Sequence, residues 1–204
     1  MSRIVVVCEG ATEELAVRHF VARQWKADGL ASVGLHPRWV PPRDIGRFAC
    51  ASLEKGEVLA VFTLVDLYGM KMVGHQAHDE LDVRVERVKT WLRAQVGTYR
   101  RSQDFFPHVS VHEVEAWILA EGTALSQRLQ DASIRPDPQA ESKDFQKPPK
   151  KRLAELFLRH KKTRYRETLD GHPLFMKMSF QPVYDSCHYF QKFYDDLKRA
   201  ATRQ

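Results

Sequence analysis

Two uninterrupted apolar runs restrict what this chain can fold into more than any other feature. Val58–Val65 contains only apolar residues and one threonine, and Arg3–Cys8 continues from its arginine with isoleucine, three valines and cysteine. Neither run alternates with polar residues, which is typical of strands buried on both faces. Strands of this kind occur in parallel sheets that helices cover on both sides. We therefore expect an α/β fold with a mostly parallel sheet.

Helical patterns alternate with these strands. Apolar residues recur at helical spacing over 17–25 and 81–92, and Thr12 is the expected N-cap of the first helix. Shorter strands are expected at 35–40 and at 107–112, where residues alternate with period two. Alternation of strands and helices predicts right-handed crossovers between parallel strands. Residues 1–122 are thus expected to form the α/β core, flanked by helices.

The last third of the chain, residues 123–204, has a different pattern. A proline-rich and charged connection over 135–149 precedes a basic helix around 152–160. A terminal helix with one apolar stripe is expected over 183–197. We expect this part to be a helical elaboration packed on the core, carrying a basic, proline-rich loop.

Composition favours an ordinary globular protein in a reducing compartment. Of 204 residues, 43% are hydrophobic and 28% charged, and there is no apolar run of the length that a membrane span needs. The first residues lack the pattern of a signal peptide, so we expect a cytoplasmic protein with no membrane partner. The cysteines, Cys8, Cys50 and Cys187, are far apart, which favours buried thiols over disulfides and over a nucleophilic Cys187.

The charge distribution indicates a polyanionic partner. The net charge is +6, and the segment 147–166 contains nine basic residues opposed only by Glu155. Such a segment is suited to contacts with the phosphates of nucleic acid, although a solvated helix face is the alternative. The candidates for nucleic-acid contacts are Lys147, Lys150, Lys151 and Arg152.

Acidic residues follow three of the expected strands. Glu9 comes after the first strand, Asp66 after the central one, and Glu113 after the strand near His108. The carboxyl ends of parallel strands meet at one edge of a sheet, where ligands bind. Clustered carboxylates repel one another unless protons or cations neutralise them, and oxygen ligands suit Mg²⁺ or Mn²⁺. The expected metal ligands are Glu9, Glu13, Asp66, Glu113 and Glu115.

Structural roles are the alternative for each acid taken singly. Glu13 is placed to favour the start of a helix, and Asp66 to cap a loop. A zinc protease motif is rejected, because Ala116 stands where a second histidine would follow His112. His75 and His78 are expected to be exposed loop residues.

Four segments carry a resemblance to a known family. The opening Cys8–Glu14 resembles the first motif of Toprim-type domains, which occur in primases, topoisomerases and nucleases of the OLD (overcoming lysogenization defect) class. Together with three later stretches it is similar to an uncharacterised Toprim-like family of unknown function. Those stretches are 63–69, 106–117 and 148–153 with 187–190.

The resemblance implies a Toprim-like fold whose acids bind Mg²⁺ or Mn²⁺ and act on a phosphodiester. By position, the catalytic acids would be Glu9, Asp66 and Glu113, with Glu115 completing the later pair. The positive charge near the phosphate would come from a lysine, with Lys151 as the candidate alongside Lys147 and Lys150. Tyr68 departs from the family pattern, because it replaces the second acid of the Asp-x-Asp motif.

Two functions of different classes follow from these observations. The first is a metal-dependent nuclease, in a defence or mobile-element system, that acts with a partner ATPase. The second is a catalytically degenerate module that binds nucleic acid or a partner ATPase, and Tyr68 favours it. A phosphotransferase or primase accessory has no distinguishing residue in this sequence.

Overall fold

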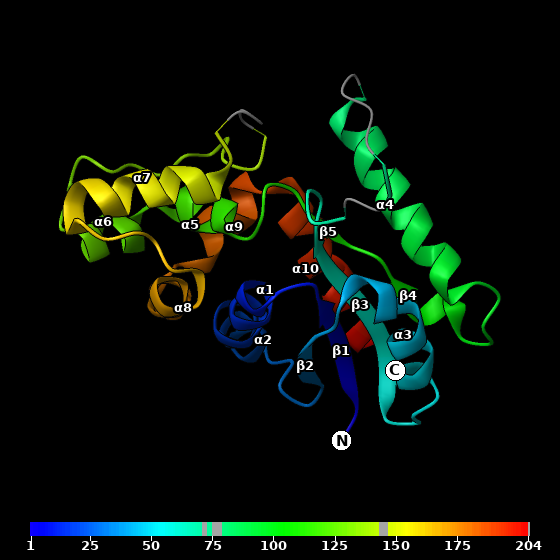
Figure 1. Ribbon diagram of the computed structural model, residues 1–204. Coiled ribbons are helices and arrows are strands. Elements are labelled where there is room, and N and C mark those ends of the chain that lie inside the picture. The colour runs from blue at the N-terminus through cyan, green and yellow to red at the C-terminus, as the bar shows by residue number, and fades with distance from the viewer. Residues whose placement is uncertain (71–72, 75–78, 143–146, 204) are drawn as a thin grey trace.

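A parallel sheet lies at the centre of the computed structural model, which describes residues 1–70, 73–74, 79–142 and 147–203 (Figure 1). The strand order is β2-β1-β3-β4, with β5 also paired to β3, and every pairing is parallel. The strands are β1 (Arg3–Cys8), β2 (Gly34–Trp39), β3 (Val58–Asp66), β4 (Phe105–Phe106) and β5 (Val109–Ser110). The α/β fold with a mostly parallel sheet is therefore confirmed.

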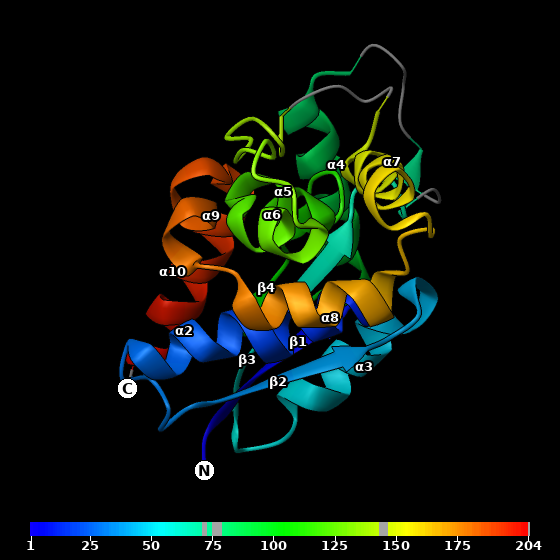
Figure 2. The same cartoon turned by 90° about the vertical axis from the view of Figure 1, so that its left-hand side faces the viewer.

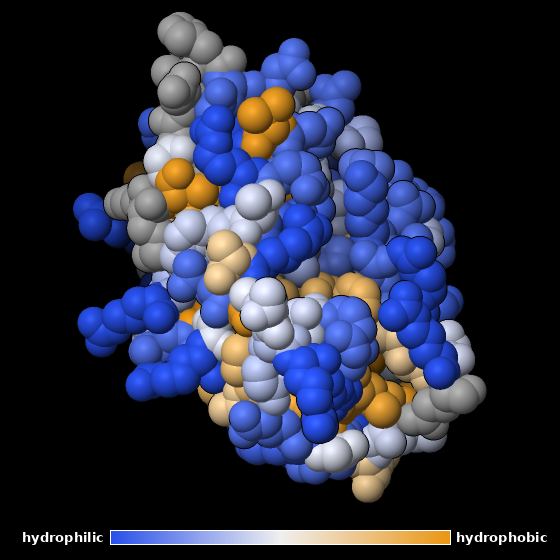
Figure 3. Space-filling model, turned by 90° about the vertical axis from the view of Figure 1, so that its right-hand side faces the viewer, coloured by the Kyte–Doolittle hydropathy of each residue, from blue (hydrophilic) through white to orange (hydrophobic). Residues whose placement is uncertain are grey.

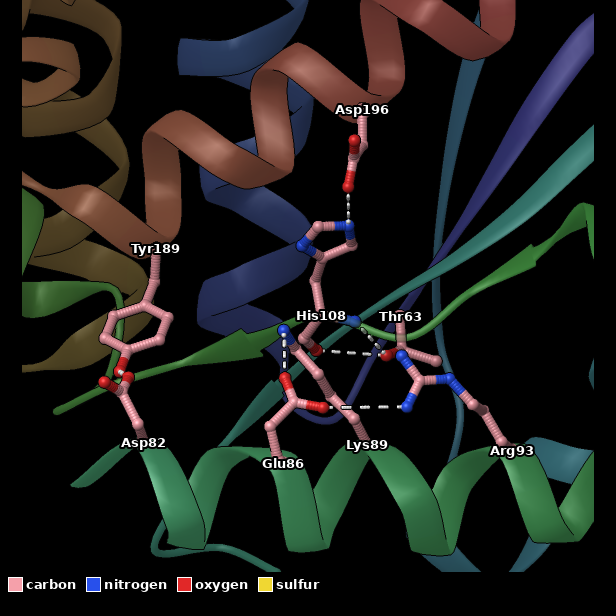
Figure 4. Close-up of polar contacts among 8 residues, drawn as sticks. All are labelled: Thr63, Asp82, Glu86, Lys89, Arg93, His108, Tyr189 and Asp196. Carbon is pink, nitrogen blue, oxygen red and sulfur yellow. Dashed lines mark hydrogen bonds and ion pairs between the residues drawn. The ribbon is translucent and has the colours of Figure 1, made fainter. Parts of the chain in front are cut away.

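The strand expected at 107–112 is replaced by the two short strands β4 and β5. Pro107, which lies between them, has no N–H to donate to a ladder. Thr63 bridges the gap with its side chain, because its Oγ1 donates to the His108 carbonyl and accepts the His108 N–H, both at 3.0 Å. This exchange, seen in Figure 4, keeps the chain beside β3 until β5 resumes the pairing.

Helices cover both faces of the sheet (Figures 1 and 2). Alternate residues of β1 join two separate apolar clusters, which explains why the strand has no polar positions. On one face pack α3 (Ile45–Leu53) and α4 (Leu81–Val96). The other face is covered by a helix running over residues 11–27 and by α10 (His188–Thr202).

The helix after β1 is composite, and it differs at its start from the sequence expectation. It comprises α1 (Ala11–Leu15), the π-helical turn η1 (Ala16–Val21) and α2 (Ala22–Ala27). Its N-cap is Gly10, whereas the expected cap, Thr12, lies inside the helix and is buried. The expectation for Thr12 was therefore wrong, because helical backbone already begins at Ala11.

The remaining helices gather above the carboxyl end of the sheet (Figure 1). They are α5 (Glu115–Glu121), α6 (Thr123–Leu129), α7 (Pro149–Lys161), α8 (Glu167–Lys177) and α9 (Phe180–Ser186). The terminal helix expected over 183–197 is interrupted at Cys187, whose extended backbone separates α9 from α10. A single apolar cluster joins these helices to β1 and β3, so the elaboration packs directly on the sheet.

Polar contacts fix α10 against the strands and against α4 (Figure 4). The buried His108 Nε2 lies 3.1 Å from Asp196 Oδ2, and the Tyr189 hydroxyl donates to Asp82. Burial, with nearby Lys89 and Arg93, lowers the pKa of His108 to about 3, so the ring is neutral and donates this bond. Short 3₁₀ turns at Pro42–Asp44 and Ser102–Asp104 complete the described elements.

The surface agrees with the composition. Figure 3 shows that the side carrying α3 and α4 is mainly hydrophilic, with apolar residues in separate patches. None of the helices in the described parts of the chain combines the length and apolar character that a membrane span needs. All three cysteines are free, and Cys8 and Cys187 are buried.

The apolar joint between sheet and helical elaboration should dominate stability. Phe190 is 1% exposed and packs against Phe20 and Trp117, with ring centroids at 5.6 and 4.6 Å. We expect Phe190→Ala to lower the free energy of unfolding by about 3–5 kcal/mol, because a cavity replaces the ring. Leu158→Ala, at a mostly exposed position, is the control and should change it by less than about 0.5 kcal/mol. Equal effects of the two variants in chemical denaturation would contradict this.

Candidate metal and phosphate site

A cavity of about 170 Å³ opens at the carboxyl end of the sheet. Six carboxyl groups and one amine line it, from strands, from helices and from the loops between them. All five acids expected at a metal site are among them. The lining residues are Glu9, Gly10, Glu13, Asp66, Glu113, Glu115, Lys150 and Glu167.

Glu9 and Asp66 meet because their strands are neighbours in register. Cys8 pairs with Leu64, so both strands end at the same edge of the sheet. Glu9 Oε2 accepts the Asp66 N–H at 3.1 Å. The Asp66 carboxylate accepts the N–H groups of Tyr68 and Gly69, at 3.1 and 3.2 Å, which fixes its orientation.

Close packing of backbone against carboxylates accounts for two glycines. A Cβ at position 69 would collide with the Glu9 carboxylate, and a Cβ at position 10 would lie 2.6 Å from Glu13 Oε2. Glycine at both positions lets the acidic side chains lie directly over the main chain. The loops after β1 and β3 are thus shaped around the acids that they carry.

An unusual backbone aims the third acid. His112 and Glu113 both have positive φ, 59° and 66°, in the left-handed region that non-glycine residues avoid. The two residues turn the chain sharply between β5 and α5, whose first residue is Glu115. In this conformation Glu113 and Glu115 both line the cavity, although residues two apart on a helix would diverge. Strain of this kind is concentrated at functional sites.

Sequence reasoning missed two residues at this site: Glu167, which lines the cavity, and Tyr165, which contacts one of its acids. Glu167, the first residue of α8, accepts a hydrogen bond from Thr12 Oγ1 at 3.4 Å. The Tyr165 hydroxyl donates to Glu115 Oε1, also at 3.4 Å. Neither residue follows a strand or belongs to a resembling motif. The only signal for them was a tyrosine and a glutamate within or beside a basic segment.

The lysine at the cavity is Lys150 rather than Lys151. Lys150 Nζ lies 2.5 Å from Glu167 Oε1, whereas Lys151 is exposed and does not line the cavity. Consecutive residues of a helix project about 100° apart, so α7 directs only one of them inward. Of the candidate lysines for the charge beside the phosphate, Lys150 lines the cavity and Lys151 does not. Lys147 and Arg152 form ion pairs with Glu155 and Asp137, at 3.1 and 2.8 Å.

Burial and mutual repulsion hold protons on the acids. Burial, followed by repulsion from neighbouring acids, raises the pKa of Glu9 and of Glu113 to about 7, and that of Glu115 to about 8. Burial likewise raises the pKa of Glu13 to about 7, and that of Asp66 above its ordinary value. Burial opposes the charge of Lys150, but the ion pair with Glu167 raises its pKa.

The chemistry of the cavity fits a divalent cation, although the present side-chain positions do not enclose one. Among the described residues no group of three or more His, Cys, Asp or Glu side chains is arranged to hold a metal. Glu113 Oε2, however, is buried without a hydrogen-bond partner. Carboxylate oxygens are the ligands that Mg²⁺ and Mn²⁺ prefer. Binding would therefore require the carboxylates to turn toward one another.

The other residues singled out in the sequence lie around the cavity or beyond the described parts. Tyr68 stacks on His112, with ring centroids 5.5 Å apart, and the Arg84 guanidinium lies over its ring. An aromatic contact thus occupies the position of the missing second acid. His75 and His78 lie outside the described residues.

Comparison with known proteins defines the class of this α/β fold. The structure is similar to the C-terminal region of the Burkholderia pseudomallei OLD protein, with a TM-score of 0.50 and 15% identity over 99% of this chain and 100% of that one. The C-terminal region of the Xanthomonas campestris pv. campestris OLD protein gives 0.42 and 15%, over 97% and 98%. No curated protein matches the sequence.

The sequence itself identifies the family. The chain belongs to the family described as Domain of unknown function (DUF4276), whose model matches residues 8–198. The expected membership of a family of unknown function is confirmed by this match, and the fold is similar to that of an OLD protein's C-terminal region, in agreement with the expected Toprim-like fold. At 15% identity the likeness to the OLD protein establishes the fold alone.

Metal affinity should depend steeply on pH. Below a pKa of about 7 the carboxyl groups of Glu9, Glu13 and Glu113 hold protons, which a cation must displace. We expect Mn²⁺ affinity, measured by calorimetry, to rise at least about ten-fold from pH 6 to pH 8, with protons released on binding. Affinity that is constant or falls over this range would contradict the expectation.

The metal-free protein should respond to pH in the opposite direction. These folded-state pKa values, about 7, exceed the ordinary value of 4.5, so the folded state holds more protons than the unfolded state between the two. The stability of the metal-free protein therefore falls as the pH rises through this window. Scanning calorimetry of metal-free samples should report this as a falling Tm.

A glycine substitution tests the site without removing an acid. In Gly69→Ala the new Cβ displaces the Glu9 carboxylate. We expect Mn²⁺ affinity to fall about ten-fold or more, as for changes in residues that orient metal ligands. Gly56→Ala is the matched control, because a Cβ there meets nothing within 4 Å. If both variants bind Mn²⁺ like the wild type, Glu9 does not hold the metal.

Proposed function

We propose that this protein is a Toprim-like nuclease that hydrolyses phosphodiesters of nucleic acid with Mg²⁺ or Mn²⁺. One observation carries the proposal: acids at or just after the ends of three different strands, Glu9, Asp66 and Glu113, line one cavity together with Lys150. If these acids served only as caps of turns or helices, we would not expect them to line one cavity together with a lysine. The fold, similar to the C-terminal region of an OLD protein, is compatible with this activity.

The proposed chemistry assigns a role to each group. A divalent cation, when bound, activates water and stabilises the leaving oxygen of the phosphodiester. Glu9, Asp66 and Glu113 would hold the cation, and Glu13 lies deeper in the same wall. Glu115, with a pKa of about 8, keeps its proton at neutral pH and limits the negative charge facing the phosphate.

Lys150 is the candidate partner for the reacting phosphate. Its Nζ is held at the cavity by Glu167, which leaves the ammonium within reach of a phosphate oxygen that enters between the carboxylates. Phosphate attracts the lysine through charge-assisted hydrogen bonds. Lys150 thereby offsets the repulsion between the acids and a polyanionic substrate.

The basic surface beside the cavity would hold the nucleic-acid backbone. Lys151 is exposed on the outer side of α7, and Lys147 and Arg152 lie near it in sequence. The ion pairs with Glu155 and Asp137 would exchange for phosphate contacts. Backbone contacts of this kind make affinity fall with salt concentration.

A partner ATPase in a defence or mobile-element system is part of the proposal. It is supported by the fold likeness to the C-terminal region of an OLD protein, a part of a longer chain. The 204 residues contain no Walker-type phosphate loop, so ATP would be used by the partner. The cytoplasmic location expected from the sequence remains part of the proposal.

A binding module without catalysis is the second candidate, and Tyr68 favours it. Tyr68 stands where the Asp-x-Asp motif of Toprim domains has its second acid, and its ring packs on His112 instead of contributing a ligand. In this role the acidic cavity would serve structure, and the basic surface would bind nucleic acid or an ATPase.

Cleavage assays distinguish the two candidates. Supercoiled DNA, linear DNA and RNA are incubated with Mg²⁺ or Mn²⁺ and with wild type, Glu9→Gln or Asp66→Asn. We expect metal-dependent cleavage by the wild type and a loss of about 100-fold or more in each variant, since each removes a ligand charge. Glu86→Gln, at an exposed acid on α4 that does not line the cavity, is the control and should cleave normally.

Two outcomes would overturn the nuclease proposal. Cleavage that persists in both ligand variants would show that the activity arises elsewhere. A wild type that binds nucleic acid or an ATPase but is inert with both metals would support the binding module.

A further inference from the structure

An exposed tryptophan lies at the rim of the acidic cavity. Trp39 is the last residue of the edge strand β2 and is 59% exposed, although large aromatic side chains are normally buried. Its indole Nε1 donates to the main-chain oxygen of Glu9 at 2.7 Å. Glu9 therefore has two contacts of interest: its side-chain carboxylate lines the cavity, and its main-chain oxygen accepts the hydrogen bond from the exposed indole. Figure 2 shows β2 as the outermost strand of the sheet.

A groove continues from this tryptophan along the surface. It has a volume of about 470 Å³ and extends from Trp39 through Pro41 to Phe48 and Ala51 on α3. Its floor is apolar and partly aromatic, as a nucleobase requires for stacking. No side chain of the cavity's acids lines it, so it is a separate surface, linked to the acidic cavity by the hydrogen bond between Trp39 and Glu9.

The segment that forms much of this groove is positively charged, and Arg47 lines the groove itself. The segment 38–47 contains three arginines, Arg38, Arg43 and Arg47, and one aspartate, which gives a net charge of +2. The side chains of Arg43 and Arg47 are more than four-fifths exposed, so their pairing with Asp44 is weak and exchangeable. Cationic groups around an aromatic platform are complementary to a base joined to its phosphates.

We propose that Trp39 and its groove form a base-stacking platform that holds an unpaired nucleotide of single-stranded nucleic acid beside the acidic cavity. The inference rests on the proposed function, because it places the substrate strand of that site. It also narrows the substrate class: a base within a duplex presents its edges and keeps its face covered by its neighbours, whereas an unpaired base can stack on the indole.

Binding without cleavage tests the platform. A labelled oligothymidine of about twelve nucleotides and an abasic strand of the same length are titrated in EDTA against wild type, Trp39→Ala and Trp39→Phe. We expect wild type to prefer the base-bearing strand, and Trp39→Ala to bind it about 5- to 150-fold more weakly while binding the abasic strand unchanged. Trp39→Phe keeps an aromatic face and should retain most of the preference.

An arginine variant serves as the matched control. Arg47→Ala should weaken binding of both strands and reduce the salt dependence by about one counterion, since it removes a phosphate contact and no stacking surface. Direct contact has its own signal, because wild-type fluorescence that is quenched by oligothymidine should lose that quenching in Trp39→Phe. Of the other three tryptophans, Trp25 and Trp117 are buried, and the half-buried Trp91 is present in both proteins and so does not produce a difference between them.

Three results would overturn the platform. The first is equal binding of both strands by wild type, and the second is unchanged binding of oligothymidine by Trp39→Ala. The third is a wild-type dimer in sedimentation that Trp39→Ala makes monomeric, because the indole would then be a contact between two copies. Since these assays need no metal, stacking without cleavage refutes only the nuclease, and cleavage without a role for Trp39 refutes only the platform.

Discussion

Repulsion among carboxylates brought to one edge of a parallel sheet is the constraint on which the rest of this structure depends. β1 and β3 run side by side in register, so the acids at their carboxyl ends, Glu9 and Asp66, are held close together. The fold tolerates this arrangement by leaving protons on several acids and by directing backbone N–H groups at Asp66. A cation bound among these carboxylates would reduce their mutual repulsion.

The C-terminal helices are as necessary to this balance as the sheet. Lys150 comes from α7 and Glu167 from α8, and both lie beyond residue 122, where we placed the end of the core. Figure 2 shows α8 lying alongside the helix that follows β1, and Thr12 of that helix donates to Glu167. The helical elaboration therefore supplies the ammonium group of the cavity and part of the cavity wall. A truncated core would retain the acids without the group that offsets them.

The sequence predicted the parts of the site that follow from strand ends and missed those that depend on packing between distant helices. Apolar runs located β1 and β3, and the rule that ligands bind at the carboxyl ends of strands then located Glu9 and Asp66. Helices α3 and α8 were not expected, because α3 spans only nine residues and α8 contains Pro173, a residue that normally interrupts a helix. The choice between Lys150 and Lys151 required the rotation of α7, which is set by contacts with α5 and α6.

Tyr68, which stands in place of the second acid of the Toprim Asp-x-Asp motif, has a structural contact of its own. Its ring stacks on His112, which precedes Glu113 in the strained turn, so Tyr68 supports the backbone that aims a cavity acid. The cavity still has six carboxyl groups, one of them Glu167 from outside the resembling motifs. The number of oxygen donors is therefore not what limits metal binding. Binding of the proposed cation would instead depend on whether the carboxylates release their protons and turn inward, and the ion pair of Lys150 with Glu167 lies in the same cavity.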